Sequence, residues 1–287
     1  MTGTAAMERA IAVTAWAVAA QRLEGWNPEQ EEIAALAMLA TDRIDFREYL
    51  GRCRRRFVDT ETWHPPVLAR RRPYLIRGSD VLANNLGLHT APTLARAEHA
   101  ISAGRTVGLL RRPPQTWTVP DLHRALFADV YPWAGEPRVT EVAKPGVRFA
   151  TVPEIEAGLT RTHRDVDEAL TCAEGYGTTA LAHRLARIYV DYNLVHPFRE
   201  GNGRTGTLLM QLIALRGGRW LSLDAVGRRE WVDASRASIN GTTVAGPDAE
   251  PVRLLVEAGL RDAASGTFGF EMPDRPAVCD IRHMIGE

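Results

Sequence analysis

The sequence lacks a net charge, a membrane-spanning hydrophobic run and a paired set of cysteines. Its 287 residues contain 35 Lys and Arg against 35 Asp and Glu, so the summed charge favours neither a nucleic acid nor an anionic membrane as a partner. The three cysteines, Cys53, Cys172 and Cys279, have no CxxC spacing. They fit a reducing, cytoplasmic compartment and give no support for a zinc site.

One apolar stretch, residues 10–20, is too short to span a bilayer. Glu8 and Arg9 precede it where a signal peptide would carry a basic cluster. We therefore interpret it as part of a buried helix and expect no membrane partner. Export as a secreted effector stays open.

Three helices are predicted near the N-terminus. The first spans residues 7–24 and ends at Gly25, a residue type favoured just past a helix end. The second begins with Asn27 as its N-cap, and the third begins after Asp45.

The chain divides by composition into four parts. The three helices make a module of residues 1–60, and residues 61–73 are a linker rich in Pro and Arg. Helical periodicity then dominates residues 74–262, and residues 263–287 form a tail.

The predicted fold is an all-α helical bundle with one short β-hairpin. The apolar segment 207–218 should be a buried central helix, and residues 248–264 should form the last helix. Within otherwise helical sequence, residues 137–151 alternate β-branched and polar residues around Pro145 and Gly146, which predicts the hairpin.

The most informative segment is HPFREGNGR, residues 196–204, between two predicted helices. Gly201, Asn202 and Gly203 lead into a helix N-terminus, where unpaired backbone N–H groups favour an anion and glycine lets it approach closely. Arg204 in the first turn adds a cationic fork suited to phosphate oxygens.

Two further side chains of this segment suggest the chemistry. Glu200 is a hard oxygen ligand suited to Mg²⁺ beside phosphates, and His196 can accept a proton near neutral pH. Taken alone, a histidine at a helix end usually caps that helix, and a glutamate usually lies on a solvent-exposed surface. Together they indicate phosphoryl or nucleotidyl transfer with Mg²⁺.

The segment resembles the signature of the Fic family, His-x-Phe-x-Asp/Glu-Gly-Asn-Gly-Arg-x-x-Arg, through its first arginine. SDVLANNLGL, LHRALFADVYPWAGEPR and FATVPEIEAGL are also similar to Fic domains, in the family's order, so the resemblance covers residues 74–262. It implies transfer of AMP, or another nucleoside monophosphate, from a triphosphate such as ATP to a hydroxyl of a target protein.

The resemblance also implies roles for individual residues. His196 would deprotonate the target hydroxyl and Glu200 would hold Mg²⁺. The nucleotide-binding residues would be Gly201, Asn202, Gly203 and Arg204. The hairpin would be the flap that docks the target by strand-like pairing, through Lys144, Pro145, Gly146, Val147, Arg148 and Phe149.

One position departs from the family signature. The second arginine should stand at position 207, where this chain has Thr207. In the family that arginine contacts the distal phosphate, so its absence could weaken ATP binding, change the donor or leave a binding module without catalysis. The phosphorylating Doc branch carries lysine where this chain has Gly203, and is therefore disfavoured.

A second resemblance concerns the N-terminal module. Many Fic enzymes are inhibited by a helix bearing Ser/Thr-x-x-x-Glu-Gly/Asn, which in one class belongs to a separate antitoxin. Glu24 and Gly25 fit this pattern, whereas Ala20 stands at the Ser/Thr position. We expect Glu24 to compete with the γ-phosphate of the triphosphate for Arg204, so the N-terminal helix would be an intramolecular inhibitor.

Two other functions compete with an autoinhibited transferase. The first is a nucleotide- or protein-binding module that has lost catalysis because of Thr207. The second is a DNA-binding regulator using the arginine runs at 52–56 and 70–72, which the zero summed charge disfavours.

Overall fold

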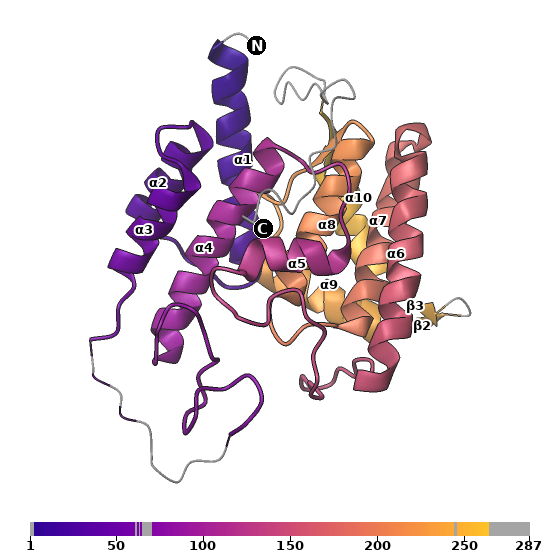
Figure 1. The fold of residues 1–287 in the computed structure, drawn as a ribbon. Helices are drawn as coiled ribbons and strands as arrows, with labels where there is room; N and C mark the ends of the chain where they lie inside the picture. The colour runs from indigo at the N-terminus through magenta and orange to yellow at the C-terminus, as the bar shows by residue number, and fades with distance from the viewer. Residues whose placement is uncertain (1–2, 61, 63, 65–70, 244–245, 264–287) are drawn as a thin grey trace.

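The computed structural model describes residues 3–60, 62, 64, 71–243 and 246–263 (Figure 1). Most of this part of the chain is helical, which confirms the all-α prediction. The α-helices are α1 Gly3–Leu23, α2 Gln30–Ala40, α3 Phe46–Arg56, α4 Ala91–Arg111, α5 Val119–Phe127, α6 Ile155–Cys172, α7 Thr178–Val195, α8 Asn202–Arg216, α9 Arg228–Asn240 and α10 Glu250–Gly259.

Two small antiparallel ladders accompany the helices. β1 (Arg219–Leu221) pairs with β4 (Leu260–Asp262), and β2 (Thr242–Thr243) pairs with β3 (Gly246–Pro247). The prediction of one helix over residues 248–264 was therefore wrong at its end. After Gly259 the chain becomes extended to pair with β1.

The predicted hairpin at residues 137–151 is a loop in this structure. Its only bridge among the described residues is antiparallel and joins Lys144 to Val147. Gly146 lies at the turn with φ +73°, a conformation that side-chain-bearing residues rarely adopt. The turn prediction is correct, whereas the predicted strand pairing is limited to this one bridge.

The end of α1 follows the predicted pattern. Gly25 has φ +103°, and the N–H of Trp26 donates to the carbonyl of Gln21 at 3.0 Å, as in a glycine-terminated helix. Apolar side chains of α1, including Val13 and Trp16, are buried. Among the described residues, no helix is long and apolar enough to cross a membrane.

The starts of α2 and α3 test two predicted caps. Asn27 is not the N-cap of α2; Glu29 is, and its N–H donates to the carboxylate of Glu32 at 2.6 Å. The acidic pair of a capping box therefore replaces the predicted asparagine. The prediction for α3 is confirmed, since Asp45 accepts from the N–H of Glu48 at 2.7 Å.

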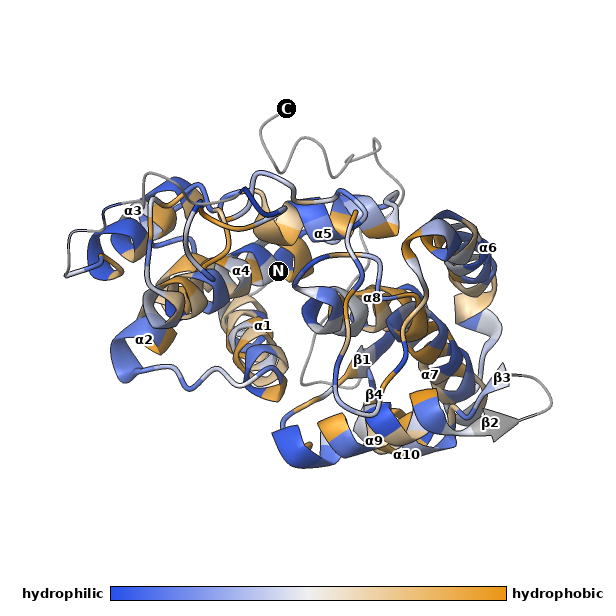
Figure 2. Ribbon diagram, turned by 90° about the horizontal axis from the view of Figure 1, so that it is seen from below, coloured by the Kyte–Doolittle hydropathy of each residue, from blue (hydrophilic) through white to orange (hydrophobic). Residues whose placement is uncertain are grey.

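The helices pack in two groups around α5 and α8 (Figure 1). In the first group α1 and α3 pack on α4, and in the second α7 contacts α6, α8 and α10. Every residue of α8 from Arg204 to Leu215 is buried, as predicted for a central helix. Figure 2 shows the hydrophobic residues concentrated where helices face one another. The N-terminal helices therefore share one continuous hydrophobic core with the rest of the fold.

Parts of the predicted linker at 61–73, and the tail at 263–287 apart from Ala263, lie outside the described residues. Of the first arginine run, Arg56 makes ion pairs with Glu29 at 2.6 Å and Glu31 at 2.5 Å. At least this arginine therefore serves the packing of α3 against the start of α2.

Candidate active site

His196 sits where α7 stops. Its backbone has φ +46° and ψ 58°, the left-handed conformation, and its N–H still donates to the carbonyl of Tyr192 at 3.0 Å. This conformation is costly for a residue with a β-carbon and is found mainly where surrounding structure enforces it. Such strain is common at functional sites, and here it turns the chain sharply from α7 into the motif loop.

The imidazole of His196 has a defined tautomer. Its Nδ1 lies 3.3 Å from the carbonyl oxygen and 3.2 Å from the side-chain oxygen of Asn193. A carbonyl can only accept, so Nδ1 carries the proton and Nε2 keeps a lone pair. Burial, and next the charge of Lys144, lower the pKa of His196 to about 3, so the ring is neutral near pH 7. Phe149 of the flap stacks on it at 3.9 Å.

The motif loop is held by a histidine that the sequence reasoning did not single out. His123 of α5 bonds through Nε2 to the carbonyl oxygen of Glu200 at 2.9 Å, and its Nδ1 accepts from the N–H of Gly135 at 2.8 Å. Its ring stacks on Phe198 at 3.8 Å. Phe198 is fully buried, as expected for the residue that seats the loop in the core. The only signal for His123 was its place in the LHRALF segment.

Arg138 is a second residue that the sequence reasoning missed. It is 1 % exposed, and its Nε donates to the carbonyl of His196 at 2.9 Å. Its other guanidinium nitrogens donate to the carbonyls of Thr140 and Ala150, at the two ends of the flap. Arg138 therefore ties the flap to the end of α7, which places Phe149 against His196.

Gly201, the N-cap of α8, and Asn202, its first residue, each have a structural role. Gly201 has φ +81°, and a β-carbon there would overlap the Phe127 ring, with Cζ only 2.5 Å away, so only glycine fits. The Asn202 side chain accepts from the N–H of Phe198 at 3.0 Å and donates to its carbonyl at 2.8 Å. Asn202 thus closes the loop with its side chain, leaving its backbone to the helix terminus.

The N-terminus of α8 is suited to an anion. The first turn, from Asn202 onward, carries N–H groups that no intrahelical carbonyl can satisfy, and the helix dipole is positive there. Glu200 precedes it with a side chain 45 % exposed, and its Oε1 accepts from the N–H of Gly201 at 3.0 Å. One accessible carboxylate at an anion-binding terminus fits Mg²⁺, which commonly takes one or two carboxylates and completes its shell with phosphate and water.

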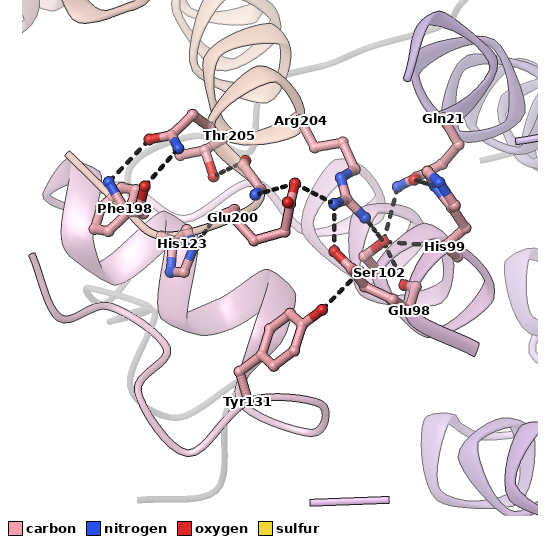
Figure 3. Close-up of polar contacts among 12 residues, drawn as sticks. Gln21, Glu98, His99, Ser102, His123, Tyr131, Phe198, Glu200, Arg204 and Thr205 are labelled. Atoms are coloured by element: carbon pink, nitrogen blue, oxygen red, sulfur yellow. Dashed lines mark hydrogen bonds and ion pairs between the residues drawn. The ribbon is translucent and has the colours of Figure 1, made fainter. Parts of the chain in front are cut away.

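Arg204 points from α8 toward α4 rather than along the loop (Figure 3). Its Nη2 forms an ion pair with Glu98 and lies 3.6 Å from Glu200 Oε1, and Nη1 lies 3.5 Å from Ser102 Oγ. Tyr131 donates to the second oxygen of Glu98 at 2.7 Å. Burial opposes the charge, but Glu98 and then Glu200 outweigh it and raise the pKa of Arg204.

The network reaches the N-terminal module through Ser102. Gln21 of α1 donates to Ser102 Oγ at 3.0 Å, and its other amide atom lies 2.7 Å from His99 Nδ1. Trp26 stacks on His99 with a centroid separation of 6.3 Å. The end of α1 is therefore connected to Arg204 by side chains of α4 (Figure 3).

Glu24 lies over the N-terminus of α8. A β-carbon built on Gly203 would fall 2.7 Å from the Glu24 Cδ, so the carboxylate rests on the glycine backbone. Burial raises the pKa of Glu24, opposed by the charge of Arg204. The cavity that remains beside Glu24, His196 and Gly203 has a volume of about 110 Å³. This volume is below the range of about 300–1,000 Å³ that is typical of pockets for drug-sized ligands.

Thr207 brings no charge to this region. It is 1 % exposed, and its hydroxyl donates to the carbonyl of Arg204 at 3.0 Å. Position 207 lies one turn after Gly203, so both positions lie on the same side of α8.

Among the described residues, no group of three His, Cys, Asp or Glu side chains could hold a metal ion.

Comparison with known proteins places these residues in a family context. The Fic/DOC family profile matches residues 114–214. The "Probable protein adenylyltransferase Fic" of Salmonella typhimurium is 30 % identical over 201 residues, or 67 % of this chain and 94 % of that protein. The "Protein adenylyltransferase VbhT" of Bartonella schoenbuchensis is 30 % identical over 175 residues, or 60 % of this chain and 36 % of that protein.

The fold is also similar to solved structures. The BepC protein of Bartonella tribocorum, solved with bound AMPPNP, matches with a TM-score of 0.59 at 20 % identity, covering 66 % of this chain and 96 % of that one. A Fic domain of Bartonella quintana, solved with bound ADP, matches with a TM-score of 0.57 at 20 % identity, covering 66 % and 94 %. At these identities the likeness shows the shared fold alone.

Proposed function

Since the chain belongs to the Fic/DOC family, we propose that it transfers a nucleoside monophosphate from a triphosphate, with ATP the first choice, to a hydroxyl of a target protein. The observation that carries this proposal is the pairing of a neutral His196, with Nε2 available as a base, and the anion-binding terminus of α8 at the end of the same loop. The relatives named as protein adenylyltransferases support ATP as the donor.

In the proposed reaction, Nε2 of His196 takes the proton of the target hydroxyl, whose oxygen attacks the α-phosphorus. The bond between the α-phosphorus and the bridging oxygen breaks, and pyrophosphate leaves. The first-turn N–H groups of α8, around Gly203, stabilise the negative charge on the phosphate oxygens. Glu200 would hold Mg²⁺, which offsets phosphate charge when bound.

In this proposal the flap binds the target protein. The loop from Lys144 to Phe149 carries one antiparallel bridge, and Phe149 contacts His196. An extended segment of the target that pairs with the flap backbone would lie close to His196. This follows because Arg138 bonds to the carbonyl of His196 and to the carbonyls at both ends of the flap. Such pairing depends on backbone groups and reads little side-chain sequence.

The module of residues 1–60 would inhibit this reaction. Glu24 holds a carboxylate where the helix terminus would receive a phosphate, and it leaves too little volume for the donor. Two negative groups in one desolvated site exclude each other, so a triphosphate can bind only when Glu24 leaves. The end of α1 must then move, or the module must separate from α4.

Three proteins test the proposed function: the wild type, Glu24→Gly and the double variant Glu24→Gly/His196→Ala. Each is incubated with Mg²⁺ and one of ATP, GTP, UTP or CTP, and its intact mass is measured. We expect the mass of Glu24→Gly to increase by one nucleoside monophosphate. A much smaller fraction of the wild type should be modified, and none of the double variant. Nucleotide binding by Glu24→Gly without any mass gain, on itself or on added cell protein, would instead support a binding module without catalysis.

A further inference from the structure

Loss of the arginine at position 207 leaves a charge deficit at the candidate nucleotide site. A bound triphosphate brings about four negative charges to α8 at neutral pH, and charge-assisted hydrogen bonds from Arg or Lys ordinarily meet them. Thr207 has no charge, and Arg204 is already paired with the buried Glu98. Another source of positive charge is needed on the side of α8 that Glu24 covers.

Lys144 is one such source. It is the only lysine in a chain whose Lys and Arg total 35, so every other basic side chain of these two types is arginine. It lines the same cavity as Glu24, His196 and Gly203. Its Nζ lies 5.9 Å from the ring centre of Phe149, the side chain that stacks on His196. Its charge acts on the pKa of both Glu24 and His196.

Arg228 is the second source, and it comes from α9 rather than α8. Its guanidinium covers the turn that follows α1, since a β-carbon on Gly25 would lie 3.2 Å from the Arg228 Nε. Its charge favours the ionised form of Glu24. Arg228 is the first residue of α9, where the helix dipole disfavours a cation. The helix dipole therefore does not favour a cation at this position.

These observations lead to one assignment. We propose that Lys144 and Arg228 replace the missing motif arginine: they attract Glu24 in the closed state and bind the distal phosphates of the triphosphate once Glu24 has left. The assignment rests on the proposed function, because it concerns the same nucleotide site. It extends that function by naming the residues that select a triphosphate over a monophosphate.

The test measures binding of Mg²⁺ with ATP, ADP or AMP to the Glu24→Gly protein by isothermal titration calorimetry. Lys144→Ala and Arg228→Ala are added singly, and two exposed arginines outside the site serve as controls, Arg164→Ala on α6 and Arg229→Ala on α9, whose side chains are 71 % and 94 % exposed. We expect each test variant to weaken ATP binding by about 10-fold or more and to leave AMP binding unchanged, because AMP has no distal phosphate. The two controls should bind all three nucleotides as the parent does.

Three results would overturn the assignment. Unchanged ATP affinity in both test variants would remove the two residues from the phosphate site. Equal losses for ATP and AMP would indicate a general structural defect. If the Glu24→Gly parent binds no nucleotide at all, the proposed function itself fails, and the assignment fails with it.

The single lysine permits a second measurement in which Lys144 itself is not replaced. An amine-specific acetylating reagent can modify Lys144 and the α-amino group, and peptide mapping separates the two. With the Glu24→Gly protein, we expect saturating Mg²⁺ and ATP to slow acetylation of Lys144 at least about 10-fold, whereas AMP should not. Equal acetylation rates with ATP and AMP would contradict contact between Lys144 and the distal phosphates.

Discussion

The carboxylate of Glu24 rests on the backbone of Gly203, at a point where residue 203 has no room for a β-carbon. The contact joins the end of α1 to the first turn of α8, two segments far apart in the sequence. The motif glycine therefore has a structural role in addition to its proposed role of letting a phosphate approach the backbone. A lysine at this position, as in the Doc branch, could not be accommodated while Glu24 stays in place.

Replacing Glu24 by glutamine should change the pH dependence of stability. Burial raises the pKa of Glu24 in the folded state, so folding favours the protonated carboxyl, and stability falls as the pH rises above the unfolded value of 4.5. Glutamine does not titrate. The unfolding free energy of Glu24→Gln relative to the wild type should therefore increase from pH 4.5 up to the folded-state pKa of Glu24. The increase should be at most about 1.4 kcal/mol per pH unit.

Urea unfolding of both proteins between pH 4.5 and 8 measures this difference. Glu31→Gln is the matched control, because the Glu31 side chain is 80 % exposed. A constant difference across the pH range would show that Glu24 ionises freely in the folded protein.

Replacing His196 by alanine should slow the transfer reaction strongly and leave binding of the nucleotide donor unchanged. A positioned general base contributes about 10²–10⁴-fold to rate, so transfer in the Glu24→Gly background should fall by that factor. Binding of Mg²⁺ and ATP should be unchanged, because His196 offers Nε2 to the hydroxyl and not to the phosphates. His183 is exposed on α7, and the control variant His183→Ala should keep full activity. A parallel loss of binding would point to a collapsed motif loop instead.

Removing Glu98 should destabilise the protein strongly. Arg204 is 5 % exposed, and Glu98 is its closest ion-pair partner, so Glu98→Ala leaves a buried cation poorly compensated. Loss of one partner of such a pair costs about 3–5 kcal/mol in unfolding free energy. Glu48→Ala, which breaks the exposed pair with Arg52, should cost less than about 1 kcal/mol. Urea unfolding measures both, and a small effect of Glu98→Ala would mean that Arg204 has another anionic partner in solution.

His99 should make the contact between α1 and α4 sensitive to acid. Burial, and then the charges of Arg204 and Arg228, lower its pKa from 6.5 to about 3. The folded state therefore resists protonation, and the stability present above pH 6.5 is lost as the pH falls from 6.5 toward 3. The slope is at most about 1.4 kcal/mol per pH unit.

His99→Gln removes this titration. Its unfolding free energy, compared with the wild type by urea unfolding, should improve relative to the wild type as the pH falls from 7 to 4.5. A parallel pH dependence of the two proteins would mean that His99 is protonated in the folded state.

Local sequence patterns were enough for most of the helices and for the motif. Capping by Asp45, the glycine that ends α1 and the apolar face of α7 depend on residues a few positions apart, so they can be read from the chain directly. One failure was also local. Glu29 capped α2 in place of Asn27, because a capping box with Glu32 competed successfully with a single asparagine.

The sequence alone determined the family resemblance, the helical fold and the placement of His196, Glu200 and Gly201–Arg204 on one loop. Only the tertiary structure decided which partner each charged side chain of the site contacts. Arg204 turns to Glu98, Glu24 reaches Gly203, and Arg228 covers Gly25, in an arrangement in which α1 packs against α4, α8 and α9. Such pairings depend on which helices meet and at what rotation, and no periodicity within one helix contains that information.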